Sequence, residues 1–300
     1  MPGRNKQLKL SASTFSFNVL SYTLITIVTI CCFFPFILLI SASFSTDMAV
    51  RMKGFSILPQ EFTTQAYELI FENPIRVIRS YWVTIYVTAI GTALGLFLIT
   101  MTAYVISRQS FKYRNHISFY FYFTTLFNGG MLATYILYIR YLGLKDNILA
   151  LIFPGLFNVF YLLIMRSFVS AIPGATIESA KIDGAGEFRI FTQIVLPLLP
   201  SGLATIGLFQ ALQYWNNWFN AMLYINSPDK YPLQYMLYNL MNRAAAMNEI
   251  AALAGYVVES LPSNSLKMAM AVIATGPIVL VYPFVQRFFI KGITIGSVKG

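Results

Sequence analysis

Long apolar runs separated by short charged segments dominate the pattern of this chain. A membrane-spanning helix needs about 20 largely apolar residues, and a charge at mid-bilayer is costly, so stretches without Asp, Glu, Lys or Arg mark candidate spans. Because these stretches are continuous rather than alternating in polarity, they predict helices and not the strands of a membrane barrel. Six reach spanning length: Leu10–Thr46, Ser80–Ser107, Ile117–Ile139, Asn147–Met165, Ile190–Pro228 and Met268–Gln286.

The predicted fold is an all-α polytopic membrane protein with one transmembrane domain over residues 1–300. The first apolar run is too long for a signal peptide and lacks a clean small-residue cleavage site, so we expect a retained helix. Residues 1–17, 170–200 and 226–267 are expected as an N-terminal segment, a loop on the same side, and a loop on the opposite side. The six helices are expected at 18–44, 80–106, 117–140, 148–168, 199–225 and 268–289.

The amino-acid composition of the chain also indicates a membrane protein surrounded by lipid. The chain is 57% hydrophobic and 11% charged, whereas soluble domains carry about 25% charged residues. Its two cysteines, Cys31 and Cys32, are adjacent, and His116 is its single histidine. This inventory disfavours a disulfide framework, a His/Cys metal site and a Ser-His-Asp hydrolase. We therefore expect no metal site, no catalytic residue and no enzyme, an intramembrane one included.

The placement of the charges indicates orientation. The net charge is +10, from 21 Lys and Arg against 11 Asp and Glu. With both termini on one side, that side holds 12 of the 21 basic residues and the other side holds nine. The positive-inside rule then favours cytoplasmic termini. The basic excess belongs to that membrane face, and nucleic-acid binding is not needed to explain it.

The interiors of the six predicted spans carry no ionisable side chain of the Asp, Glu, Lys or Arg type. Transporters driven by ion gradients generally place such groups there as relays. Uphill transport by this chain would therefore need energy from another protein. A self-sufficient channel or facilitator, which would need no partner, is the alternative from another class.

The fifth predicted span carries an uncharged polar and aromatic stripe. Two interpretations stay open. Aromatic rings can stack on sugar C–H faces while amides bond hydroxyl groups, which would make the stripe a substrate pathway. Alternatively, it provides interhelical hydrogen bonds and an aromatic belt. Its members are Gln213, Tyr214, Trp215, Asn216, Asn217, Trp218 and Asn220, with Gln210 one turn earlier.

Residues 171–200 predict a helix–turn–helix. A short helix can begin near Thr176, Gly184 and Gly186 break it, and a second helix runs from Glu187 to Val195 until Pro197 redirects the chain. Such a unit can dock a soluble partner, or it can be an interfacial hairpin.

The residues of this segment resemble the EAA loop of ABC importer permeases, the coupling helix that inserts into a groove of the ATPase subunit. One departure is Ser179 in place of the first alanine of the motif. The segments 62–67, 127–131 and 282–292 also look like maltose-type carbohydrate permeases, in particular the smaller of their two permease subunits. The matching loop residues are Glu178, Ser179, Ala180, Asp183, Gly184, Ala185, Ile194, Leu196 and Pro197.

This resemblance implies a permease subunit of an ATP-driven, binding-protein-dependent sugar importer in the bacterial plasma membrane. The implied partners are a second permease subunit, two cytoplasmic ATPase subunits that bind ATP and Mg, and an extracytoplasmic sugar-binding lipoprotein. No cofactor is implied for this chain itself. The resemblance further implies that Asn226–Lys267 reaches the binding protein, while the transported sugar stays unspecified.

Overall fold

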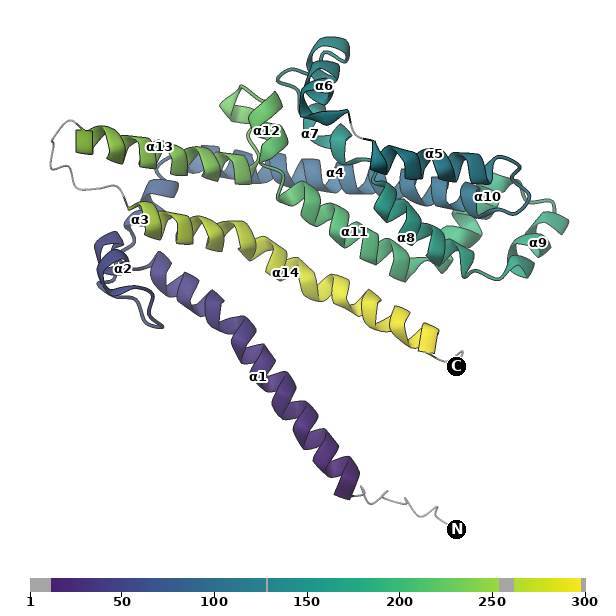
Figure 1. The fold of residues 1–300 in the computed structure, drawn as a ribbon, viewed down its shortest axis with the longest axis horizontal. Helices are drawn as coiled ribbons and strands as arrows, with labels where there is room; N and C mark the ends of the chain where they lie inside the picture. The colour runs from purple at the N-terminus through teal and green to yellow at the C-terminus, as the bar shows by residue number, and fades with distance from the viewer. Residues whose placement is uncertain (1–11, 128, 254–261, 298–300) are drawn as a thin grey trace. The chain divides into compact units, whose positions relative to one another are not determined.

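Helices dominate the computed structural model, which describes residues 12–127, 129–253 and 262–297. These residues contain no β-strand, and one isolated antiparallel bridge joins Ser45 to Phe62. The predicted all-α architecture is confirmed. The helices (Figure 1) are α1 (Ala12–Ser43), α2 (Asp47–Lys53), α3 (Gln65–Ile70), α4 (Pro74–Ser107), α5 (Arg114–Leu126), α6 (Gly130–Ile136), α7 (Leu149–Ile152), α8 (Val159–Ser170), α9 (Gly174–Ile182), α10 (Glu187–Ile190), α11 (Pro200–Trp215), α12 (Phe219–Tyr224), α13 (Leu233–Leu253) and α14 (Ser263–Ser297).

Three helical stretches among the described residues are long and apolar enough to cross a membrane: Ser16–Ser43, Pro74–Ser107 and Ser263–Val281. Two bent helix pairs raise the number to five if each pair is one span. One pair joins Leu149–Gly155 to Val159–Ser170 at 54°, and the other joins Glu187–Leu198 to Pro200–Trp215 at 84°. The structure therefore supports a multi-pass helical membrane protein with three to five candidate spans in its described part.

The predicted third span, 117–140, is not one continuous helix. α5 ends at Leu126, α6 begins at Gly130, and a π-helix follows from Leu137 to Tyr141. Gly130 has φ +80°, a conformation that glycine adopts without the usual steric cost. The adjacent glycines Gly129 and Gly130 are poor helix formers, so the sequence predicts a local break at this point, and the structure has one.

The segment 226–267, predicted as a loop, contains the 21-residue helix α13. Its Leu, Met, Ala and Gln residues are good helix formers, which explains why this segment between two predicted spans is helical over Leu233–Leu253. Residues 254–261 of this segment lie outside the described residues, as do residues 1–11 of the predicted N-terminal segment.

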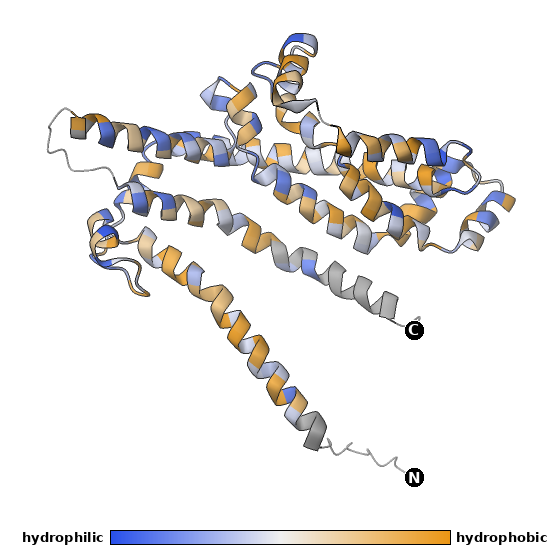
Figure 2. Ribbon diagram, viewed as in Figure 1, coloured by the Kyte–Doolittle hydropathy of each residue, from blue (hydrophilic) through white to orange (hydrophobic). Residues whose placement is uncertain are grey.

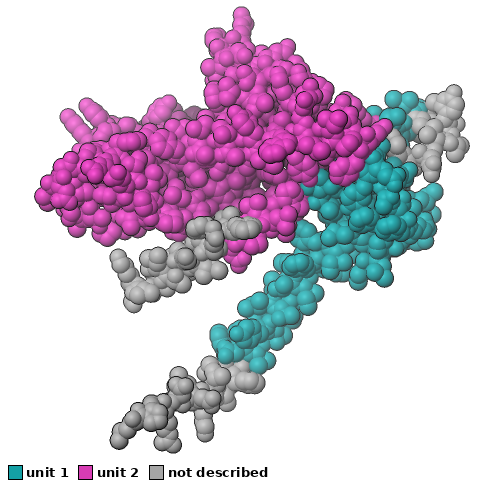
Figure 3. Space-filling model, turned by 180° about the vertical axis from the view of Figure 1, so that it is seen from behind, with its two compact units in different colours: residues 1–70, 244–273 teal, residues 71–243, 274–300 magenta. Residues whose placement is uncertain are grey.

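The chain divides into two compact units, residues 1–70 with 244–273 and residues 71–243 with 274–300 (Figure 3). In the second unit, α4 packs along α8 and α11 (Figure 1). α4 has 34 residues, a length of about 50 Å, which exceeds the hydrocarbon core of about 30 Å. The Asn73 side chain accepts a hydrogen bond from the Arg76 N–H, and Pro74 occupies the first turn. Both features fix where α4 begins.

The first unit is held by polar contacts around α2. The buried Asp47 carboxylate accepts hydrogen bonds from the backbone N–H groups of Asn264 and Ser265. It therefore caps the N-terminus of α14, where a negative charge is stabilising. The same carboxylate pairs with Arg51 at 2.6 Å, and Arg51 donates to the Ser263 hydroxyl. These bonds join the start of α14 to the segment that follows α1.

Helix α1 is coated with exposed apolar side chains, and none of the residues in its spanning window is buried. Figure 2 shows it orange over most of its length. In lipid such exposure carries no penalty, because the acyl chains are as apolar as the side chains. Cys31 and Cys32 are both exposed, free thiols on this helix.

Candidate functional site

Residues 174–198, which we call the Gly184 hairpin, begin with α9 and a sharp turn. Gly184 has φ +78°, a conformation strained for any residue with a Cβ. The Gly184 N–H donates to the Lys181 carbonyl and the Ala185 N–H donates to the Ala180 carbonyl, at 3.0 and 2.9 Å. This pair of bonds is a Schellman motif. Gly184 thus ends α9 and reverses the chain toward α10.

Apolar burial anchors the Gly184 hairpin. Ile177 and Ala180 of α9, Ile190 of α10, and Phe191 and Val195 of the following π-helix are buried. They belong to one core cluster with residues of α4 and α8. The spacing of Ile177 and Ala180 places both on one face of α9. That face packs inward, and the opposite face is left outside.

A polar contact supplements this core at the end of α4. The hydroxyl of the buried Tyr104 donates to the Glu187 carboxylate at 2.5 Å, and Lys181 pairs with the same carboxylate at 2.5 Å. Glu187 is the first residue of α10, where a negative charge is favourable. Its carboxylate therefore joins α4, α9 and α10.

The outward face of the Gly184 hairpin combines charged and apolar side chains. Glu178, Ser179 and Asp183 are exposed. Ile182 is 87% exposed and Phe188 is 67% exposed. Ile182 and Phe188 therefore add exposed apolar area to the charged outer face of the hairpin. Of the other predicted loop residues, Ala180 is buried and Ala185 packs against the core.

The end of the Gly184 hairpin differs from the predicted path. The chain continues beyond Ile190 as a π-helix to Val195 and a 3₁₀ turn over Leu196–Leu198. The 84° bend separates Glu187–Leu198 from Pro200–Trp215. The chain is therefore redirected at Leu199 and Pro200 rather than at Pro197. Pro197 is tolerated because it lies in the first turn of the 3₁₀ segment. Ile194 and Leu196 pack against the core.

The predicted stripe of the fifth span separates into buried and exposed members. Tyr214 and Trp215 are buried, and their polar atoms donate to the carbonyls of Ile152 and Ala274 at 2.7 and 3.0 Å. Gln213, Asn216 and Trp218 are exposed, and Asn217 and Asn220 are intermediate. Gln213 lies within α11, Asn216, Asn217 and Trp218 lie between α11 and α12, and Asn220 lies in α12.

The role of Gln210 is one that the sequence did not reveal. Its side chain is fully buried, and its Nε2 donates to the Gly155 carbonyl at 2.9 Å. Gly155 lies at the break between α7 and α8, where carbonyls lose their helical partners. Together with Tyr214, Gln210 satisfies this break. Both side chains fit because α4 has glycine opposite them: a Cβ at Gly91 or Gly95 would lie 2.5 Å from Tyr214 or 1.8 Å from Gln210.

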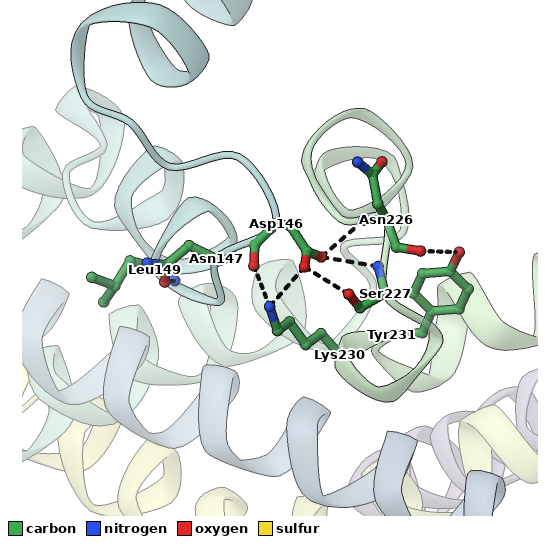
Figure 4. A network of polar contacts seen from close by, with 7 residues as sticks. All are labelled: Asp146, Asn147, Leu149, Asn226, Ser227, Lys230 and Tyr231. Carbon is green, nitrogen blue, oxygen red and sulfur yellow. Dashed lines mark hydrogen bonds and ion pairs between the residues drawn. The ribbon is translucent and has the colours of Figure 1, made fainter.

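A second unpredicted feature is the polar cluster that we call the Asp146 clamp, shown in Figure 4. The Asp146 carboxylate accepts hydrogen bonds from the backbone N–H groups of Asn226 and Ser227, from the Ser227 hydroxyl, and from Lys230 Nζ at 2.8 Å. Lys230 also donates to the Asp146 carbonyl. The Lys230 ammonium, followed by the Ser227 donors, holds the pKa of Asp146 well below its usual range. The clamp joins segments 80 residues apart.

No protein-family model matches the chain. It is 41% identical over 284 residues to the polygalacturonan/rhamnogalacturonan transport system permease protein YtcP of Bacillus subtilis, covering 95% of this chain and 98% of that protein. It is 40% identical over 268 residues to Protein LplC of the same organism, covering 89% of each. The chain belongs to the carbohydrate ABC transporter permeases.

A solved structure agrees with this assignment. The permease has a TM-score of 0.74 and 30% identity to a chain of a bacterial ABC transporter involved in the import of the acidic polysaccharide alginate, with 96% of this chain and all of that chain covered. The permease is thus a multi-pass plasma-membrane component of a sugar ABC transport system, and not itself an enzyme. Within its described residues, no group of three or more His, Cys, Asp or Glu could hold a metal ion.

Proposed function

We propose that this permease forms half of a sugar pathway and couples it to a separate ATPase through residues 171–200. The observation that carries the proposal is the packing of the Gly184 hairpin. Its inner face is buried in the core shared with α4 and α8, while Glu178, Ser179 and Ile182 remain outside. A push on the exposed face would therefore be transmitted into the spans instead of being absorbed by a flexible loop.

The partners in this proposal are a second permease subunit, two cytoplasmic ATPase subunits and an extracytoplasmic sugar-binding lipoprotein. YtcP is named as a permease of a transport system, and the alginate importer is an ABC transporter, which supports a multi-subunit assembly. ATP and Mg would bind in the ATPase chains. Closure of those chains would move the hairpins and open the pathway alternately to each side.

The proposed topology has six spans with cytoplasmic termini. The three continuous helices and the two bent pairs supply five spans, and the broken pair α5 and α6 supplies the sixth. The excess of basic residues on the side of the termini supports the orientation. In this topology the Gly184 hairpin faces the cytoplasm and the Asp146 clamp faces the exterior.

We infer an acidic oligosaccharide as the transported sugar. The relative YtcP is named for polygalacturonan and rhamnogalacturonan, and the structural neighbour imports alginate, an acidic polysaccharide. The sequence identities to these two proteins are 41% and 30%, which are high enough for the comparison to bear on function as well as on fold. The broken end of the fifth span, with exposed Asn216 and Trp218, offers amide and ring groups suited to sugar hydroxyls and C–H faces.

The coupling role is tested with Gly184→Val and Glu178→Ala in the importer expressed with its partners. A valine at φ +78° costs about 1–3 kcal/mol and should disorder the turn, so ATPase co-purification and uptake should both fall. Glu178→Ala should lower them without changing membrane insertion. Gly186→Ala is the matched control, since Gly186 has an ordinary φ of −68° and open space around it. Normal ATPase retention and uptake in both test variants would disprove the coupling role.

A further inference from the structure

Basic side chains gather where α4 ends and α5 begins. Arg108 follows the last residue of α4, Lys112 lies in the connecting turns, and Arg114 is the first residue of α5. The Phe111 N–H donates to the Arg108 carbonyl, and the Arg114 N–H donates to the Phe111 carbonyl, each at 3.2 Å. Two successive tight turns therefore hold these three basic residues in one short segment.

Arg166 of α8 joins this group from a different helix. Its guanidinium donates to the Ser118 hydroxyl at 3.2 Å, and Ser118 donates to the Arg114 carbonyl at 2.6 Å. This chain of bonds brings the charge of Arg166 to the first turn of α5. We call the four basic residues the cationic rim; they are Arg108, Lys112, Arg114 and Arg166.

No carboxylate of the described residues forms an ion pair with the cationic rim. The sequence has no Asp or Glu between Glu72 and Asp146. The carboxylate of Glu187, which lies near the rim, is already bonded to Tyr104 and Lys181. The rim therefore presents positive charge that this part of the chain does not neutralise.

Aromatic rings orient two of the four charges. The guanidinium carbon of Arg108 lies 5.6 Å from the centre of the Tyr104 ring, and Lys112 Nζ lies 5.9 Å from the centre of the Tyr113 ring. Such contacts attract a cation to the ring face and leave its charge available to an anion. Lys112 and Tyr113 are both exposed, and Arg108 is partly exposed.

An exposed apolar face continues from the rim along α5, which packs beside α4 (Figure 1). Ile117 and Phe121 pack against the core shared by α4 and α8. On the other side, Phe119, Tyr120 and Phe123 are exposed, and no residue of α5 is fully buried. A positively charged rim next to an apolar face matches the two parts of an anionic phospholipid, its phosphate and its acyl chains.

The position of the rim along α4 favours a lipid headgroup over a soluble anion or a soluble protein. The uncharged part of α4, residues 80–107, is about 42 Å long at about 1.5 Å per residue. A bilayer with its headgroups is about 40–45 Å thick, so Arg108 lies at headgroup level when α4 spans it. Basic clusters at that level bind anionic lipids, and aromatic residues such as Phe111 and Tyr113 concentrate there. A free phosphate would leave the apolar face of α5 unused.

We propose that the cationic rim binds the phosphate of an anionic phospholipid whose acyl chains lie along the exposed face of α5. The forked guanidinium groups of the rim suit phosphate oxygens. The site requires only that α4 spans the membrane. It depends neither on the transported sugar nor on coupling to the ATPase, so the proposed function and the lipid site can fail separately.

The test uses the complete importer with photoreactive benzoylphenylalanine in place of Tyr120. This position lies on the exposed face of α5, about 10 Å along the helix from Tyr113. The liposomes contain equal amounts of phosphatidylglycerol and phosphatidylcholine, without ATP or sugar. Mass spectrometry of the permease gives the ratio of phosphatidylglycerol to phosphatidylcholine adducts, which should be well above one. Lys112→Gln and Arg114→Gln should each lower this ratio by up to about fivefold, the value of one charge at an anionic surface.

Two controls separate the rim from basic charge in general. Lys112→Arg keeps the charge and should keep the ratio. Arg140→Gln removes an exposed basic residue of the π-helix after α6, outside the rim, and should leave the ratio unchanged.

Three results would overturn the lipid site. The first is a ratio of one in the wild-type rim, and the second is an unchanged ratio when Lys112→Gln and Arg114→Gln are combined. The third is a cross-link from position 120 to an ATPase chain or to the second permease in place of lipid, which would show that protein covers this face.

Discussion

The two ends of α4 are joined to the rest of the permease by different kinds of interaction. Near its end, Tyr104 meets the Gly184 hairpin within a large apolar core, with one carboxylate added at the rim. Near its start, Arg79 pairs with Asp229, and the neighbouring Asp146 clamp is a network of polar bonds around one carboxylate. The first end is held mainly by a large apolar core, whereas the second combines a smaller core around Val83 and Val87 with a network of charges.

This difference matches the task that each end has in the proposed mechanism. Apolar burial of many groups resists bending because dense packing transmits force. Bonds to one partly exposed carboxylate can be broken and remade at modest cost, because each is worth about 1–3 kcal/mol net. We therefore expect the hairpin end to behave as a lever, and the clamp end to be the more easily opened part.

The largest expected effect comes from truncating the buried side of the hairpin. Ile190 is 0% exposed, and Ile190→Ala should cost about 2–5 kcal/mol and lower the thermal unfolding midpoint of the purified importer. Ile182→Ala removes the same side chain from an 87% exposed site, so the midpoint should stay within the range of a surface substitution. ATPase retention should still weaken in the Ile182→Ala variant. Equal destabilisation by both substitutions would show that burial does not hold the hairpin.

A smaller effect is expected at the clamp. Asp146→Asn keeps the shape of the side chain but removes the charge that pairs with Lys230. We expect the free energy of unfolding to fall by about 1–2 kcal/mol, a value set low because both side chains are partly exposed to solvent. The measurement is again the unfolding midpoint, accompanied by protease sensitivity of the 142–148 and 226–230 segments. A loss as large as that of Ile190→Ala would contradict the contrast between the two ends.

The clamp should also respond to pH. Because hydrogen bonds from Lys230 and then Ser227 lower the pKa of Asp146, the carboxylate contributes its full stability above the ordinary aspartate pKa of about 4. That contribution is lost as the pH falls below this value. The difference in unfolding midpoint between wild type and the Asp146→Asn variant should therefore be constant near pH 7 and shrink below pH of about 4. A difference that grows on acidification would have the wrong sign.

The smallest effect is expected for the exposed pair of Arg79 and Asp229. Both side chains are more than half exposed, and such pairs are worth about 0–1 kcal/mol and are screened by salt. Asp229→Asn should shift the midpoint far less than Asp146→Asn does, and high salt should abolish the shift. A salt-resistant loss as large as that of Asp146→Asn would place this pair among the principal contacts of the clamp.

Local signals predicted much of the Gly184 hairpin but little of the Asp146 clamp. Gly184 requires a left-handed turn, and that requirement is visible in the sequence, so the predicted helix boundaries near Thr176 and Glu187 lie within two residues of the observed ones. Asp146 is bonded to residues 80 to 84 positions later. Nothing in the local sequence of either segment marks the other as its partner.

Hydropathy and backbone propensity carry different information. Transfer free energy counts apolar residues and takes no account of the backbone, so hydropathy alone shows the third run as continuous, whereas the glycines Gly129 and Gly130 mark the local break in it. Leu233–Leu253 gives no span signal, because this helix is too polar to span the membrane, and its helical structure was therefore not predicted.

The sequence by itself determined that the chain lies in a membrane, that its fold is all-α, where the hairpin turns and to which family it belongs. These properties depend on sums of local properties and on short motifs. The tertiary structure decided which members of the polar stripe are buried, that Gln210 and Tyr214 donate hydrogen bonds to carbonyls at the break between α7 and α8, and that Trp218 stacks on Tyr238 of α13. These outcomes depend on how each helix is rotated against its neighbours. Rotation is set by packing between distant segments, such as the fit of Tyr214 over Gly91, and no local pattern encodes it.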